Sequence, residues 1–226
     1  TCALPIWVGT LEARGTFDGK EARGDAFAEL VGWTDPVVFK RRNDEFYADY
    51  QAGRLDIHEY VRFATEAVRL KGQVQAEAAR AQFLREVIQP AVRPEAQALI
   101  QRHRDQGCQV MIVTATNEFV TRPIAQLFGI DELIAVELAR DAQGWITGEI
   151  AGVPSMREGK VQRLQQWLLA RGWDWQDVET TFYSDSTNDL PLLGRVNHPV
   201  ATNPDDRLRE QAQQRGWPVL ELFSAS

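Results

Sequence analysis

The sequence is organised around the stretch Thr181-Phe182-Tyr183-Ser184-Asp185-Ser186-Thr187-Asn188-Asp189-Leu190-Pro191. An apolar, β-prone run leads into a polar turn with two carboxylates four residues apart, and the chain then resumes as an apolar helix start. This pattern predicts a strand that ends in a loop and opens a helix. Because ligands bind beyond the carboxyl ends of parallel strands, we expect Asp185 at the strand tip and Asp189 one turn later, in a binding crevice.

Two carboxylates held in this way suit a Mg²⁺ ion, which keeps several waters and bridges to a substrate phosphate. Asp and Asn are also ordinary turn and N-cap residues. The acidic pair alone therefore leaves both interpretations open, and the rest of the chain has to distinguish them.

Length, charge and cysteine content limit the class of protein. The 226 residues suffice for one large domain or for a core with a small insertion. The net charge of −7 argues against nucleic acid as a partner, so a phosphorylated substrate needs local positive charge from a metal or a lysine. Only Cys2 and Cys108 are present, and no apolar run reaches the ~20 residues that span a bilayer. We expect a cytoplasmic protein without a membrane partner; the sequence gives no signal for its oligomeric state.

Helical patterns dominate the first part of the chain. Asp35-Pro36 opens a helix to about Gln51, Asp56-x-x-Glu59 opens a second, and a third runs from about Gln75 to Ile88. The absence of a strand pattern between them predicts a small all-helical insert. We expect His58, His103 and His198 to be surface or capping residues, because they lack metal-ligand spacing.

From Pro94 onward, apolar strand patterns alternate with helical patterns. A helix to Gln106 precedes the strand Val110 to Val113, a hairpin ends at Ile150, and a helix from Glu158 to Ala170 precedes the central strand. This alternation predicts an α/β fold with a doubly wound parallel sheet.

Two further residues lie where such a sheet would bind a ligand. Thr114 ends the strand Val110 to Val113 and precedes a helix, where its hydroxyl could contact a phosphoryl oxygen or simply cap the helix. Lys160 begins a helix, where the macrodipole opposes a cation, so it needs a partner such as phosphate or a carboxylate. Taken alone, this lysine could equally be solvated.

Three stretches, taken in chain order, resemble motifs two to four of the haloacid dehalogenase-like hydrolases. They are Ile-Val-Thr-Ala-Thr-Asn at Thr114, Arg-Glu-Gly-Lys at Lys160 and the stretch with Asp185 and Asp189. The residues of these motifs are similar to those of the phosphoserine-phosphatase-like branch of the family, in which a helical cap lies between motifs one and two. The resemblance covers about Asp25 to Phe223. It implies a Rossmann-like parallel sheet at residues 94–226 with a helical cap at residues 25–93.

The resemblance also implies a Mg²⁺-dependent phosphatase that works through an aspartyl-phosphate intermediate. Asp185 and Asp189 would bind the metal, and Thr114 and Lys160 would contact the transferring phosphoryl group. Substrate choice would depend on the cap, whose sequence does not distinguish phosphoserine, histidinol phosphate or another small phosphomonoester.

The chain departs from the family at the first motif. No Asp-x-Asp-x-Thr occurs in residues 1–34; a gapless count places the expected acids at Thr10 and Glu12, and Asp18 is the nearest alternative. Our hypothesis is that residues 1–24, an atypical segment, are foreign to the rest through a shifted reading frame or a joined fragment. The chain as written would then be weakly active or inactive.

Other functions remain open. One is a non-catalytic phosphate or metabolite binder on the same fold. A dehalogenase is disfavoured by the acidic pair, and a dinucleotide-binding domain by the lack of Gly-x-Gly-x-x-Gly after the first strand.

Overall fold

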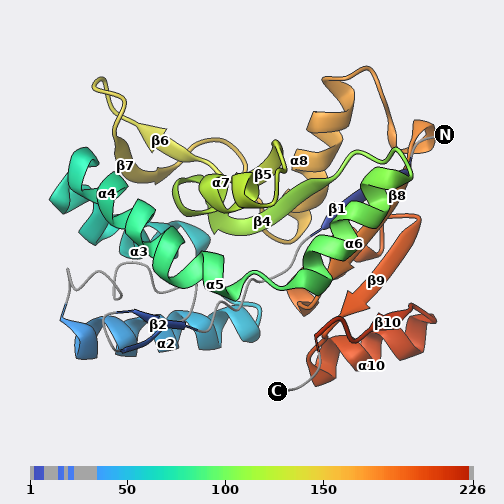
Figure 1. The fold of residues 1–226 in the computed structure, drawn as a ribbon, viewed down its shortest axis with the longest axis horizontal. Coiled ribbons are helices and arrows are strands. Elements are labelled where there is room, and N and C mark those ends of the chain that lie inside the picture. Colours follow the sequence, from blue (N-terminus) through green and yellow to red (C-terminus); the bar gives the residue numbers. More distant parts are fainter. Residues whose placement is uncertain (1–2, 8–14, 18–19, 23–34, 224–226) are drawn as a thin grey trace.

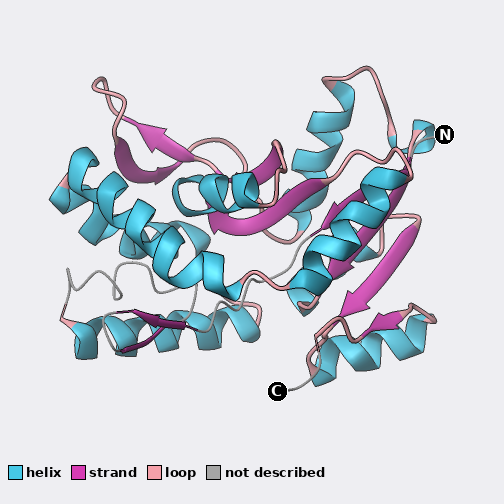
Figure 2. Cartoon of the chain, in the orientation of Figure 1, coloured by secondary structure: helices cyan, strands magenta, loops and turns pink. Residues whose placement is uncertain are grey.

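The computed structural model describes residues 3–7, 15–17, 20–22 and 35–223. Its main element is a six-stranded sheet with the strand order β10-β9-β8-β1-β4-β5, in which every pairing is parallel. The strands of this sheet are β1 (Ala3–Trp7), β4 (Met111–Asn117), β5 (Glu132–Val136), β8 (Glu179–Ser184), β9 (His198–Thr202) and β10 (Val219–Leu220). The parallel α/β sheet predicted from the sequence is confirmed (Figure 2).

Strand β1 occupies the centre of the sheet. Trp7 pairs with Tyr183 of β8 on one side and with Ile112 of β4 on the other. The apolar run Leu4 to Val8 predicts a short strand, which β1 confirms, and β1 lies between the two strands that lead to the candidate site. The division of the chain into residues 1–24, 25–93 and 94–226 stays a prediction.

Two apolar cores cover the two faces of the sheet. Ile112 and Tyr183 belong to one core, whereas Val113 and Phe182, their neighbours in sequence, belong to the other. This separation follows from the alternation of side chains along a strand. The helices around the sheet are α6 (Pro94–Asp105), α7 (Glu118–Leu127), α8 (Glu158–Leu169), α9 (Leu190–Leu193) and α10 (Asp206–Arg215). Helices α6 and α7 contribute to the first core, and α8, α9 and α10 to the second.

The helical part of the chain follows the sequence prediction closely. It comprises α2 (Pro36–Gln51), α3 (Ile57–Lys71), α4 (Gln73–Phe83), a π-helical turn (Leu84–Ile88) and α5 (Gln89–Ala91). The side chains of Asp35 and Asp56 accept hydrogen bonds from the first backbone N–H groups of α2 and α3, as N-cap residues do. Helices α2, α3 and α4 lie at the left of Figure 1, away from β9 and β10.

Aromatic side chains join α2 to α3. Phe39 and Phe63 stack with ring centroids 4.7 Å apart, and Phe46 lies 5.1 Å from Phe63. In the sequence, Val38 and Tyr47 are among the apolar positions of this helix, which predicts that they are packed, but they are 49% and 47% exposed. The prediction is wrong because α2 packs through a narrower stripe than its apolar residues suggest.

The remaining elements are short. They are the hairpin strands β2 (Gly15–Phe17) and β3 (Lys20–Ala22), the hairpin strands β6 (Leu138–Arg140) and β7 (Ile146–Ile150), and the 3₁₀ turns Trp175–Asp177 and Thr187–Asp189. The predicted hairpin that ends at Ile150 is confirmed, and β7 packs against α3. None of the described helices is long and apolar enough to cross a membrane.

The expectation for His103 is corrected. His58 and His198 are exposed, but His103 is half-buried on α6, and its Nε2 lies 2.8 Å from the Tyr183 hydroxyl. It belongs to the packing between α6 and β8.

Candidate active site

A buried ion pair joins the start of α8 to the turn after β8. Lys160 Nζ donates to Asp189 Oδ1 at 2.5 Å, and the two side chains are 3% and 2% exposed. Ser184 Oγ donates to the other oxygen, Asp189 Oδ2, at 2.7 Å. Since a buried pair is stable only when its remaining polar atoms are satisfied, these two donors hold the orientation of the Asp189 carboxyl group. Asp189 also supplies the partner that a lysine in a first helical turn requires.

The backbone at Gly159, directly before Lys160, packs closely against the carbonyl oxygen of Pro154. A Cβ on Gly159 would collide with the carbonyl oxygen of Pro154, and Gly159 N donates to Met156 O at 2.9 Å. Only glycine fits here without displacing the first turn of α8. Gly159 therefore determines where Lys160 can lie.

The loop after β8 is closed by its own serines. Ser186 N donates to Ser184 Oγ at 3.1 Å, and Ser186 Oγ accepts from Asn188 N at 3.2 Å. These bonds turn the chain so that Asp189 returns to the end of β8. Asp185 follows β8 directly and is half-buried.

The pKa of Tyr50, in the last turn of α2, reflects the negative charges of this loop. Burial, followed by the negative charges of Asp189 and Asp185, raises the pKa of Tyr50 to about 12. The hydroxyl thus lies in the negative field of both carboxylates. That field favours a cation at the loop.

The donor set fits Mg²⁺. One or two carboxylates with waters and substrate oxygens are the usual protein ligands of this ion. Although Asp189 already accepts two hydrogen bonds, a carboxylate has about four acceptor positions, so it can also bind the metal or its waters. Among the residues described, no cluster of three or more His, Cys, Asp or Glu forms a metal site. Asp185 and Asp189 would therefore hold the ion with water and substrate.

Thr114 lies at the same edge of the sheet. Trp7 of β1 pairs with Ile112 of β4 and with Tyr183 of β8, and Thr114 and Asp185 each follow two residues after these partners. Because their strands are separated by β1, about 10 Å, or two strand spacings, separates the backbones of Thr114 and Asp185. We expected the strand to end at Val113, with Thr114 next to a helix start. Instead β4 continues to Asn117, which caps α7, and the register against β5 is shifted between Val113 and Asn117.

This irregularity changes the role open to Thr114. The Thr114 hydroxyl accepts from Thr116 N at 3.2 Å, so it closes a turn within the irregular segment rather than capping α7. Such irregularities are common next to active sites because they redirect side chains. A contact between Thr114 and a phosphoryl group stays a prediction.

Sequence reasoning missed several residues of this site. Ser184 is part of the central stretch, but nothing in the sequence showed that its hydroxyl bonds to Asp189. Tyr50 lies 136 residues from Ser186 in sequence, yet their hydroxyl oxygens are 2.9 Å apart. No local pattern marks a contact over that separation.

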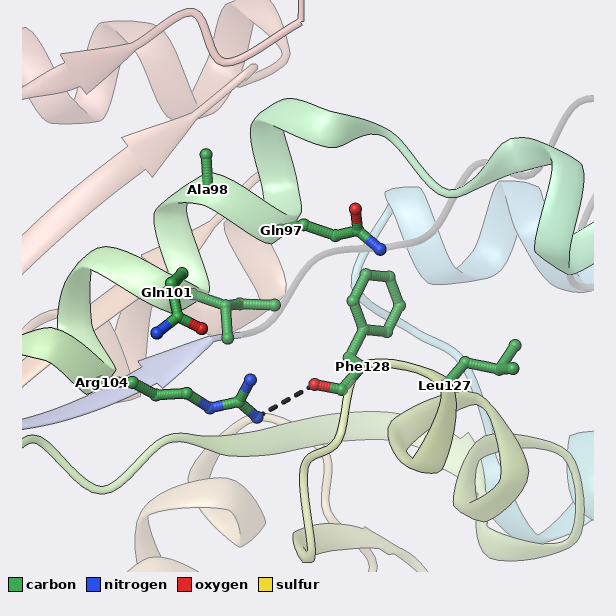
Figure 3. Close-up of a pocket in the computed structure, with 7 residues that line it drawn as sticks. Gln97, Ala98, Gln101, Arg104, Leu127 and Phe128 are labelled. Atoms are coloured by element: carbon green, nitrogen blue, oxygen red, sulfur yellow. Dashed lines mark hydrogen bonds between the residues drawn. The ribbon is translucent and has the colours of Figure 1, made fainter.

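A cavity of about 360 Å³ lies elsewhere, between α6 and the end of α7. Figure 3 shows Gln97 and Gln101 on α6 and Phe128 after α7, with Arg104 bonded to the Phe128 carbonyl oxygen. None of the four predicted site residues lines it, so it is not the candidate active site.

Comparison with known proteins identifies the family. The family described as haloacid dehalogenase-like hydrolase matches residues 9–194. This chain belongs to that family. The resemblance inferred from the three motifs is confirmed.

Several relatives and solved structures are similar to this family member. A histidinol-phosphatase of Neisseria meningitidis is 40% identical over 192 residues, which cover 84% of this chain and 86% of the relative. A phosphoserine phosphatase of Mycobacterium tuberculosis is 29% identical over 94% of this chain and 63% of its own length.

Among solved structures, a protein of unknown function from Bordetella pertussis has a TM-score of 0.85 at 38% identity, covering 99% of this chain and all of that one. A substrate-bound phosphoserine phosphatase has a TM-score of 0.62 at 15% identity, covering 98% of this chain and 94% of that one, which shows the shared fold.

Proposed function

We propose that this chain carries the active site of a Mg²⁺-dependent phosphomonoester hydrolase for a small phosphorylated metabolite. The observation that carries the proposal is the buried Lys160–Asp189 pair, which lies one turn from Asp185 at the carboxyl edge of a parallel sheet. Membership of the hydrolase family and the names of its relatives support the same reaction class.

Each residue has a distinct part in this proposal. Asp185 would bind the Mg²⁺ ion and Asp189 would hold it or its waters, and the bound ion would supply positive charge to the phosphoryl oxygens. Lys160 would offset further negative charge, and Thr114 would donate to a phosphoryl oxygen. Phosphoryl transfer needs chiefly such positioning and charge stabilisation.

The reaction would pass through an aspartyl-phosphate intermediate. It requires a nucleophilic carboxylate and a second acid that protonates the leaving oxygen and later activates water. Residues 1–34 contain no Asp-x-Asp-x-Thr, and the nearest candidate, Asp18, lies outside the described residues. We therefore expect slow turnover by this chain.

Histidinol phosphate is the first substrate to test and phosphoserine the second. The 40% identity with a histidinol-phosphatase supports this order. Selection between them would depend on residues 25–93, the proposed cap. A cytoplasmic location is part of the proposal, because the sequence has only two distant cysteines.

A second candidate is a phosphate or metabolite binder that does not turn over. The missing first motif favours it, because Thr114, Lys160 and the acidic pair could bind phosphate and Mg²⁺ without a nucleophile.

One experiment separates the two candidates. Phosphate release from histidinol phosphate and from phosphoserine is measured with and without Mg²⁺, beside calorimetric binding of Mg²⁺ and inorganic phosphate. Slow Mg²⁺-dependent release that Asp185→Asn abolishes supports the hydrolase. Binding without release supports the second candidate, and neither binding nor release would refute both.

A further inference from the structure

The C-terminal end of α2 is fastened to the loop that carries the acidic pair. The Tyr50 hydroxyl lies 2.9 Å from Ser186 Oγ, and Asn188 Nδ2 donates to Tyr50 O at 3.0 Å. One residue later, Gln51 O accepts from Arg207 Nη1 at 3.1 Å. Tyr50 O also accepts from Gly53 N at 3.1 Å, so the contacts from Asn188 and Arg207 add side-chain donors to the carbonyl groups of the last helical turn.

Arg157 extends the same junction. Its Nε donates to Asn188 Oδ1 at 3.2 Å, and its guanidinium lies so close to Gly53 that a Cβ there would collide with it. Arg157 and Arg207 thus bring two cations to the negative end of the α2 dipole, where positive charge is stabilising. The junction combines charge with directional hydrogen bonds.

The Tyr50 hydroxyl also begins a continuous series of polar contacts. Tyr50 contacts Ser186 Oγ; Ser186 N donates to Ser184 Oγ at 3.1 Å; Ser184 Oγ donates to Asp189 Oδ2 at 2.7 Å; and Asp189 Oδ1 accepts from Lys160. Asp185 lies within the same loop, between the two serines. A shift of α2 would therefore reach both carboxylates through these bonds.

We propose that Tyr50 is a positioning residue of the site, which couples the end of α2 to the geometry of the metal-binding loop. The inference deepens the proposed function and rests on it for the identity of the ion. Tyr50 acts through Ser186: its hydroxyl fixes the serine whose backbone and side chain close the loop around Asp185. Removing this hydroxyl group should therefore loosen the loop and weaken its affinity for Mg²⁺, although the contacts of Asn188 with Tyr50 O and Arg157 remain.

Tyr50→Phe tests the inference, because it removes the hydroxyl and keeps the ring. Tyr47→Phe is the matched control: it makes the same change one turn earlier on α2, at a side chain that is 47% exposed. Hydrogen exchange of the loop amides is measured without metal, and Mg²⁺ affinity is measured by calorimetry well below the unfolding temperature. Asn188→Ala is the second variant, since it removes the other link to Tyr50.

We expect Tyr50→Phe to accelerate exchange of the Ser186 and Asn188 amides about fivefold and to weaken Mg²⁺ binding by a similar factor, as the loss of one net hydrogen bond predicts. Tyr47→Phe should change neither quantity. Unchanged loop exchange in Tyr50→Phe would overturn the inference, as would faster exchange with unchanged Mg²⁺ affinity. A wild-type chain that binds no Mg²⁺ refutes the proposed function instead, while loop exchange still reports whether Tyr50 orders the loop.

Discussion

Lys160 Nζ lies 2.5 Å from Asp189 Oδ1, and both side chains are almost completely buried. Breaking such a pair on one side leaves an uncompensated charge without water, which costs about 3–5 kcal/mol of folding free energy. We predict this loss for Lys160→Met. The double variant Lys160→Met/Asp189→Leu should lose less, because it removes both charges. Urea unfolding measures the difference, and a double variant less stable than Lys160→Met would contradict the prediction.

Gly159→Ala should destabilise the protein by about 1–3 kcal/mol, because the added methyl group collides with Pro154 O and must displace the start of α8. Without that collision, alanine in a helix would stabilise by about 0.5–1 kcal/mol, so the sign of the change is informative. Gly194→Ala is the control: its Cβ would lie 3.2 Å from Leu190 O, which needs only a small adjustment. The free energy of unfolding of the two variants should differ clearly, and equal values would show that α8 adapts.

The region around Thr114 shows which features of the site can be predicted from the sequence and which cannot. The apolar strand patterns before Thr114 and Asp185 predicted β4 and β8, because the apolar run of a strand is a local property of the sequence. The extension of β4 to Asn117 was missed, because it depends on pairing with β5. Tyr50 was missed for the same reason: its partner Ser186 is brought near by the tertiary fold alone.

His103 should make folding stability fall in mild acid. Burial first, and then the nearby Arg102, hold the pKa of His103 below its usual value of 6.5, so the unfolded chain binds the proton more readily. Stability from this group is present above about pH 6.5 and is lost as the pH falls toward the folded-state pKa.

Thermal unfolding between pH 7.5 and 5 measures this loss. We expect the unfolding temperature of His103→Gln to depend less on pH than that of the wild type. His58→Gln, at an exposed position on α3, is the control and should follow the wild type. A His103→Gln profile parallel to the wild type would assign the acid sensitivity to other groups.

Turnover of p-nitrophenyl phosphate tests the departure at the first motif. In the proposed function the site residues would stabilise charge and position phosphate, but attack on phosphorus needs a carboxylate that residues 1–34 do not offer in the family's pattern. We predict weak or undetectable hydrolysis, even at saturating Mg²⁺. Robust Mg²⁺-dependent turnover that is lost in Asp185→Asn would contradict this prediction. Asp18→Asn would then decide whether Asp18 is the nucleophile, because a nucleophile variant should lose turnover but keep the Mg²⁺ affinity that we propose for Asp185 and Asp189.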